Sequence, residues 1–103
     1  MLDLDLDRQR REFMRWVLLL ALYNGRPVET WEGVLVSTMQ GVYADATKRE
    51  VRVELDYLEE RGLVKIKRRP DGNWFAELNR AGVDVVEYTV ECEPGIARPA
   101  KLD

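Results

Sequence analysis

The side chains of this sequence that are best suited to chemistry are cations, and they gather in two short stretches. Residues 61–69 carry only basic charges and no acid, although the whole chain has a net charge of −3. Charge segregation of this kind lets a local patch bind phosphate even when the total charge is negative. The candidate phosphate-binding residues are Lys48, Arg49, Arg52, Lys65, Lys67, Arg68 and Arg69.

Other kinds of chemistry are poorly represented. The chain has no histidine and a single cysteine, Cys92, which excludes an internal disulfide and the usual zinc ligand sets. No nucleophile is accompanied by a base, so a catalytic triad is excluded. The acidic residues between 54 and 60 are expected to form a solvated helix face, since they lack the ordered oxygen-ligand loop of a calcium site. We therefore expect a protein that is not an enzyme and needs no metal or cofactor.

The length of 103 residues is enough for one domain. We expect a flexible lead-in over residues 1–7, a domain over 8–90 and an extended C-terminal tail over 91–103. The longest apolar run, Trp16 to Tyr23, is too short to span a bilayer. Since no secretion signal is evident either, the expected location is the cytoplasm, without membrane contact.

The first expected helix covers about residues 8–24 and is stopped by Gly25. Its buried stripe follows the i, i+3, i+4 spacing and comprises Phe13, Trp16, Val17, Leu20 and Ala21. Met14, Leu18 and Leu22 lie off this stripe, so the helix is apolar on more than one face. The second apolar face predicts a further contact, either a dimer interface or the C-terminal tail.

A second helix is expected from Thr30, acting as N-cap, to about Gln40. Its core positions would be Val34, Leu35 and Met39. Trp16 and Trp31 are assigned to the core or to a dimer interface, since no polar constellation accompanies them.

The third helix and the following hairpin have the clearest signals. Thr47 and Glu50 have capping-box spacing, and Gly62 ends the helix. The buried positions of this helix are expected to be Val51, Leu55 and Leu58. Two strands, 63–68 and 74–78, flank a Pro-Asp-Gly turn, because proline presets one turn angle and glycine accepts a positive φ. A short fourth helix, capped by Asn79, is expected over about 81–88.

This order of elements resembles the winged-helix superfamily, an α+β and mainly helical class with a three-helix core, a β-hairpin wing and a short C-terminal helix. The junctions Val51-x3-Leu55-x2-Leu58-x3-Gly62 and Glu77-Leu78-Asn79-Arg80-Ala81-Gly82 carry this resemblance. The ending Pro94-Gly95-Ile96-Ala97-Arg98-Pro99 is similar to a family of small winged-helix proteins of Mu-like phages and prophages. That family has no assigned role, so the resemblance implies no catalytic residue.

The leading functional expectation is binding of double-stranded DNA, with a recognition helix over 48–61 and a basic wing over 63–78. The interleaved acids Glu50, Glu54 and Asp56 oppose it, because they would repel phosphate. Protection of a sheet edge from aggregation is the alternative for the hairpin lysines, but it does not require the arginines that continue into the turn. One of Trp74 and Phe75 must face outward, where it could stack on a base or anchor a protein partner. The favoured alternative is an aromatic residue of the hairpin that packs over the third helix.

The alternative expectation is a protein-interaction adaptor in phage assembly or packaging, with a phage protein as partner. A homodimer through the first helix is a further expectation. A dimer would present two moderate basic patches to one duplex, which together would be sufficient for DNA binding.

Overall fold

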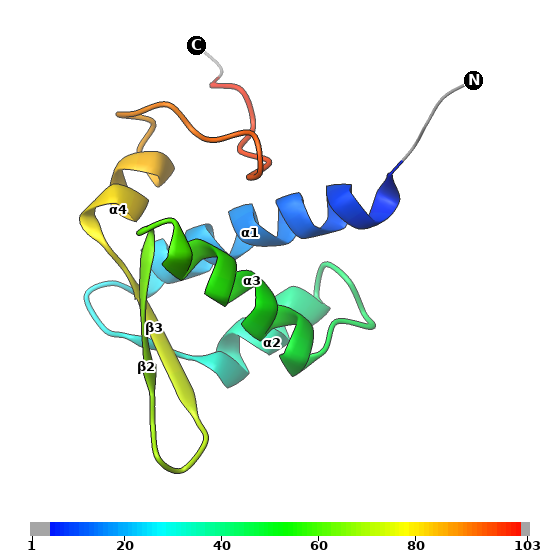
Figure 1. The fold of residues 1–103 in the computed structure, drawn as a ribbon, viewed down its shortest axis with the longest axis vertical. Helices are drawn as coiled ribbons and strands as arrows, with labels where there is room; N and C mark the ends of the chain where they lie inside the picture. The colour runs from blue at the N-terminus through cyan, green and yellow to red at the C-terminus, as the bar shows by residue number, and fades with distance from the viewer. Residues whose placement is uncertain (1–4, 102–103) are drawn as a thin grey trace.

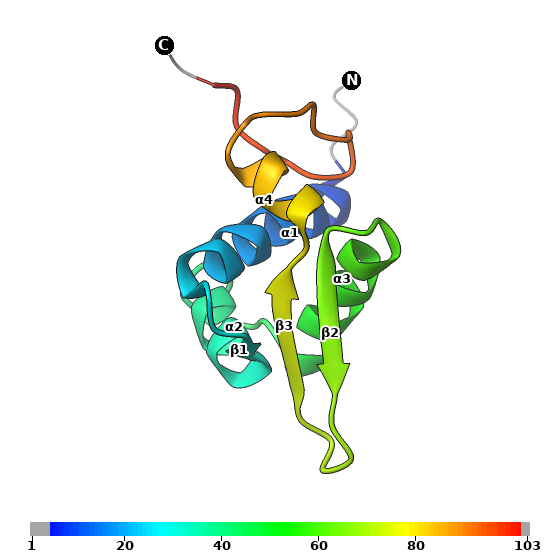
Figure 2. The same cartoon turned by 90° about the vertical axis from the view of Figure 1, so that its left-hand side faces the viewer.

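A computed structural model of the chain describes residues 5–101, which form an α+β fold of four helices and a three-stranded antiparallel sheet (Figure 1). The helices are α1 (Leu6–Gly25), α2 (Glu32–Gln40), α3 (Lys48–Glu60) and α4 (Arg80–Val86). The strands are β1 (Thr30–Trp31), β2 (Val64–Arg68) and β3 (Trp74–Leu78), in the order β1-β3-β2 across the sheet. Helices α1, α2 and α3 lie behind one face of the sheet, and no helix crosses the other face (Figure 2).

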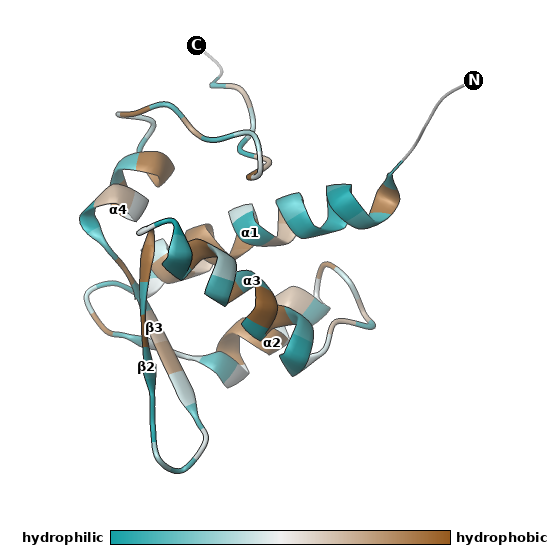
Figure 3. Cartoon of the chain, in the orientation of Figure 1, coloured by the Kyte–Doolittle hydropathy of each residue, from teal (hydrophilic) through white to brown (hydrophobic). Residues whose placement is uncertain are grey.

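Helix α1 is the scaffold of the domain, since it contacts α2, α3, α4 and β3. Its first turns are hydrophilic and its C-terminal half is mostly hydrophobic (Figure 3). The predicted buried stripe was partly wrong. Phe13 is 38% exposed, whereas Met14, Leu18 and Leu22 are fully buried. The stripe was misplaced because the helix is packed from several sides, so a single 3.6-residue period does not describe its contacts.

Helix α4 and the C-terminal tail also pack against α1. Residues 91–101 contain no regular helix or strand, yet Ile96 is only 4% exposed and belongs to the core. The backbone N–H of Ala97 donates to the Glu12 carbonyl at 3.0 Å, and Arg15 Nη1 donates to the Gly95 carbonyl at 2.8 Å. The tail, one of the two partners expected for α1, therefore packs against this helix, and a dimer through α1 stays a prediction.

The start of α2 differs from the prediction. Thr30 is not its N-cap: Thr30 and Trp31 pair with Ala76 and Phe75 as the short strand β1. Helix α2 begins at Glu32. Sheet pairing with β3 is a non-local contact, which capping signals in the local sequence do not report.

Two side chains of this region are also exposed where core positions were expected. Leu35 and Met39 are buried as predicted, but Val34 is 51% exposed. Trp16 lies in the core, whereas Trp31 is 48% exposed on the sheet.

The predictions for α3 and the hairpin are largely confirmed, with α3 ending at Glu60 and β2 starting at Val64. Only half of the predicted capping box forms, because the Glu50 carboxylate binds Arg10 of α1. Thr47 Oγ1 accepts the Glu50 backbone N–H at 3.1 Å, and Gly62 stops the helix with a φ of +75°. The expected core positions Val51, Leu55 and Leu58 are fully buried. Strands β2 and β3 pair with Ile66 opposite Ala76, and the turn glycine Gly72 has a φ of +89°.

Helix α4 starts after Asn79, as predicted, but its cap is different. The Asn79 side chain makes no capping bond to α4 and instead donates to the carbonyls of Gly62 and Val64, both at 3.2 Å. It therefore ties the end of β3 to the segment that enters β2. The helix ends at Val86, two residues before the predicted end.

At the other end of the chain, α1 begins at Leu6 rather than Arg8, with Asp5 accepting the Arg8 N–H at 2.9 Å. The first four residues of the predicted lead-in lie outside the described residues. Within residues 5–101 no helix is both long and apolar enough to cross a bilayer.

The packing of the tail gives a first prediction. Replacing Ile96 with Ala should lower the free energy of unfolding by about 2–4 kcal/mol, because it leaves a cavity against α1. Replacing the exposed Val90 with Ala should change it by less than about 0.5 kcal/mol. Urea denaturation followed by circular dichroism measures both. Equal stabilities for the two variants would contradict the placement of the tail in the core.

Candidate nucleic-acid interface

Two of the three acids of α3 that were expected to oppose phosphate binding, Glu50 and Glu54, are paired with arginines of α1. Arg10 of α1 binds Glu50 in a bidentate pair, with Nε to Oε2 at 2.7 Å and Nη2 to Oε1 at 2.8 Å. Arg15 binds the buried Glu54 at 2.7 Å. Both carboxylates are thus neutralised by α1, and their repulsion of a bound phosphate is correspondingly reduced.

The outer surface of α3 near its first turns carries cations and an aliphatic side chain. Lys48, Arg49 and Val53 are exposed. Within residues 5–101, Lys48 and Arg49 form no ion pair. The N-terminal end of a helix also has unpaired backbone N–H groups and a positive partial charge, both of which favour anions. This end of α3 is the part of the predicted recognition helix best suited to phosphate.

A groove of about 550 Å³ adjoins this surface, between the N-terminal parts of α1 and α3. Its lining includes Arg11, which is exposed and was not among the predicted site residues. Arg10 and Arg49 line the same groove, together with the acids Asp7, Asp45, Glu50 and Glu54. Arg11 adds a cation on α1 beside the start of α3, but the mixed lining of the groove defines no pocket for a single ion.

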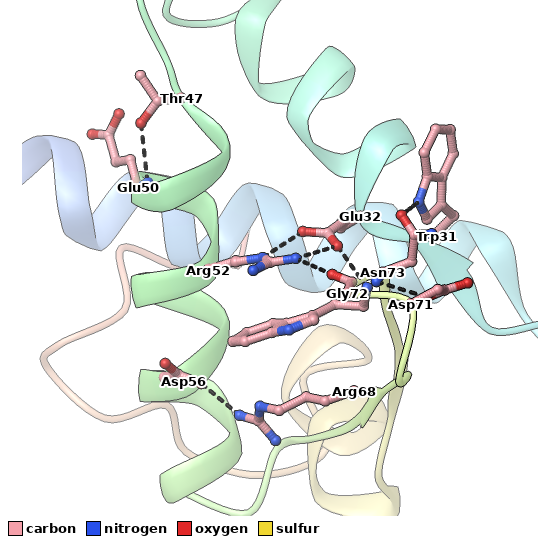
Figure 4. A network of polar contacts seen from close by, with 11 residues as sticks. Trp31, Glu32, Thr47, Glu50, Arg52, Asp56, Arg68, Asp71, Gly72 and Asn73 are labelled. Atoms are coloured by element: carbon pink, nitrogen blue, oxygen red, sulfur yellow. Dashed lines mark hydrogen bonds and ion pairs between the residues drawn. The ribbon is translucent and has the colours of Figure 1, made fainter.

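The tip of the hairpin is attached to α3 through a buried carboxylate. Glu32, 2% exposed, accepts both guanidinium arms of Arg52 at 2.6 and 2.7 Å, and also accepts the Trp74 backbone N–H (Figure 4). Arg52 donates in addition to the Gly72 carbonyl in the turn, at 2.6 Å. The hydrogen-bonded Arg52 holds the pKa of Glu32 below its ordinary value. Arg52 was predicted to contact DNA, but its guanidinium is occupied within the fold.

Arg68 has a similar structural task. It binds Asp56 at 2.6 Å and Glu59 at 2.8 Å, both on α3, and the pair lowers the pKa of Glu59. The guanidinium groups of Arg52 and Arg68 each lie 4.4 Å from the centre of the Trp74 ring. We call Glu32, Arg52, Arg68 and Trp74 the wing clamp, since together they fasten the hairpin to α3 by ion pairs and cation–π contacts.

The remaining predicted residues of the hairpin lie on its outer side. Lys65 approaches Glu77 at 3.9 Å, and the side chain of Lys67, 62% exposed, approaches Glu29 at 3.3 Å. Exposed pairs of this kind contribute little to stability, so exchanging the carboxylate for a phosphate costs little. Arg69 is exposed and lies 5.1 Å from the centre of the Phe75 ring.

The seven predicted residues are therefore not one continuous patch. Lys48 and Arg49 lie at the start of α3, whereas Lys65, Lys67 and Arg69 lie on the outer side of the hairpin. Between them, Arg52 and Arg68 join the two elements. Arg11 was not among the predicted residues, although the basic run Arg8-Gln9-Arg10-Arg11 signals it, and the exposure of Trp31 was not predicted either.

Comparisons with protein-family models, with curated proteins and with solved structures found no match to this chain. In the part of the chain that the structure describes, no group of three or more histidine, cysteine, aspartate or glutamate residues is placed to hold a metal ion.

The wing clamp gives a second prediction. Replacing Glu32 with Gln should lower the free energy of unfolding at neutral pH by about 2–3 kcal/mol, because it confronts the Arg52 guanidinium with an amide and leaves a charge without its partner. Chemical denaturation measures this change. Glu29→Gln is the matched control, since its partner Lys67 is exposed, and it should change stability by less than about 0.5 kcal/mol.

The same pair predicts a pH dependence. Because the folded-state pKa of Glu32 lies below its ordinary value of 4.5, the pair stabilises the fold above that value. This stabilisation disappears as the pH falls through the lower, folded-state pKa. The stability difference between the parent and Glu32→Gln should accordingly be largest at neutral pH and shrink in acid. A difference that grows on acidification would contradict this assignment.

Proposed function

We propose that this chain is a winged helix-turn-helix protein that binds double-stranded DNA without catalysing a reaction. In this reading α2 and α3 are the two helices of the motif, and the β2–β3 hairpin is the wing. The resemblance to proteins of Mu-like phages stays a prediction.

The proposal rests on which charged side chains of α3 are paired inside the fold and which are exposed. Its acids Glu50 and Glu54 are bound by arginines of α1, while Lys48 and Arg49 are left exposed. The start of α3, where the cations are exposed and the neighbouring acids are paired, can approach a polyanion despite a net charge of −3 for the chain.

The mode of binding follows from the motif. The N-terminal residues of a recognition helix reach base edges in the major groove while neighbouring cations contact phosphates. Lys48 and Arg49 are suited to both tasks, and Arg11 extends the phosphate contacts. The exposed Val53, one turn further along α3, offers an apolar surface to the methyl group of thymine.

In this proposed mode of binding, the wing contacts the phosphate backbone of the DNA next to the recognition helix. Its cations are Lys65, Lys67 and Arg69, whereas Arg68 is retained by the wing clamp. Because the clamp fastens the hairpin to α3, the helix and the wing meet the duplex as one rigid surface. That rigidity lowers the entropy cost of ordering the wing on binding.

A second candidate function, a protein-interaction adaptor in phage assembly, is favoured by a different observation. Several large apolar side chains are exposed, among them Trp31, Val34 and Val53. Apolar residues of this size are suited to the centre of a protein interface. An adaptor would bind its partner with little dependence on salt, which separates it from a DNA-binding protein.

The DNA-binding proposal predicts the effect of a double charge reversal. In Lys48→Glu with Arg49→Glu, affinity for a mixed-sequence duplex should fall, because two cations become repulsive toward phosphate. The slope of log affinity against log salt concentration should become shallower by about 2, one unit for each lost contact. Fluorescence anisotropy over a range of salt concentrations measures both quantities.

A matched control reverses two exposed cations away from this surface, in Arg80→Glu with Lys101→Glu. It changes the net charge by the same amount and should leave most of the affinity intact. Equal losses in the two double variants would show that only total charge matters and would contradict a defined site on α3. Absence of duplex binding by the parent at low salt would favour the adaptor.

A further inference from the structure

The outer face of the sheet carries a second candidate site, which does not depend on duplex binding by α3. We propose that this face binds the unpaired bases of single-stranded nucleic acid, with Trp31 and Phe75 as stacking platforms and with Lys67 and Arg69 as phosphate contacts. Figure 2 views the sheet from this side, where no helix covers it.

Strand register places these residues in one row. Trp31 of β1 is paired with Phe75 of β3, and Phe75 is paired on its other side with Lys67 of β2. Directly paired residues of antiparallel strands project from the same face, so the three side chains share the open face. Arg69 adds a second cation, since its guanidinium lies over the Phe75 ring.

Trp31 is held in one position although it is 48% exposed. Its Nε1 donates to Asn73 Oδ1 at 3.2 Å (Figure 4), and its ring lies over the backbone of Gly33. A Cβ atom at position 33 would come within 2.5 Å of that ring, so the absence of a side chain at Gly33 leaves room for the indole. An exposed aromatic ring that is already ordered loses little conformational entropy when a base stacks on it.

The charges around the two rings fit a polyanion. Lys67 and Arg69 flank Phe75, and Lys65 lies further along β2. Glu77 and Glu29 lie opposite the two lysines, at 3.9 and 3.3 Å, in exposed pairs that solvent screens. Cations interleaved with aromatic rings on an open face are typical of surfaces that bind single strands, where the cations track the backbone and the rings receive bases.

The same features argue against a duplex as the occupant of this face. In double-stranded DNA both faces of each base are stacked on neighbouring bases and are closed to an aromatic side chain. Trp31 and Phe75 could not use their rings there. Unpaired bases offer those faces, and stacking on them does not require a particular sequence.

The test uses the full chain and a short fluorescent oligothymidine, which has no duplex structure. Two substitutions at one position separate stacking from simple apolar contact: Trp31→Phe retains an aromatic ring, and Trp31→Leu retains apolar bulk alone. We expect the parent to bind the probe and Trp31→Phe to remain within about threefold of it. Trp31→Leu should lose about tenfold or more, in line with the contribution of one base–aromatic stack. Circular dichroism checks that each variant is folded.

Two further variants complete the design. Phe75→Leu should lose affinity for oligothymidine as Trp31→Leu does. The α3 variant Lys48→Glu with Arg49→Glu should keep that affinity while losing duplex binding, so the two proposals can fail separately. Oligothymidine binding that is absent in the parent, or equal in folded Trp31→Leu and Trp31→Phe, would overturn the inference. A dimer mass in light scattering that returns to about 12 kDa in Trp31→Leu would overturn it too, since a second copy would then cover this face.

Discussion

The arrangement of this domain depends on the buried carboxylate of Glu32. Burying a charge is costly unless it is paired and fully hydrogen-bonded, and Glu32 has partners on two other elements, Arg52 of α3 and the Trp74 N–H of β3. A carboxylate at the first residue of α2 is favoured by the helix dipole as well. The three elements can satisfy it only in one mutual position. This requirement orients the hairpin relative to α3 more specifically than apolar packing alone would.

The arginines of this chain divide into two groups with different physical tasks. Arg10, Arg15, Arg52 and Arg68 use planar, bidentate or stacked contacts to join helices and strands, a task for which lysine is poorly suited. Exposed cations such as Lys48 and Arg49, which form no ion pair within residues 5–101, are the second group. The number of basic residues in a segment therefore overestimates how many of them can bind phosphate. The number of acids on α3 likewise overestimates how strongly the helix repels phosphate, because acids and bases are paired with each other inside the fold.

The two proposed surfaces meet at the hairpin and share its outer cations Lys67 and Arg69. The side that carries Trp74 is turned toward α3 and is closed by the wing clamp, while the side that carries Phe75 remains open. Alternation along β3 is the cause, since adjacent residues of a strand must face opposite ways. One strand can thereby contribute to the attachment of the wing and present an aromatic ring to a ligand. A chain that bound duplex DNA through α3 and unpaired bases through the sheet would be suited to a junction between the two.

Local signals in the sequence determined α3, the hairpin and their boundaries, because caps, turn glycines and periodic burial act over a few residues. Thr47, Gly62 and Gly72 are examples, and all three have the conformations that their neighbourhoods predict. Tertiary structure alone decided which face of α1 is buried, that residues 30 and 31 form a strand, and that Arg52 serves the fold. Each of these depends on a partner far away in the sequence. From the sequence, Arg52 could either face solvent or bind within the fold. Only the folded chain brings the buried carboxylate of Glu32 beside it, and this contact gives Arg52 its structural role.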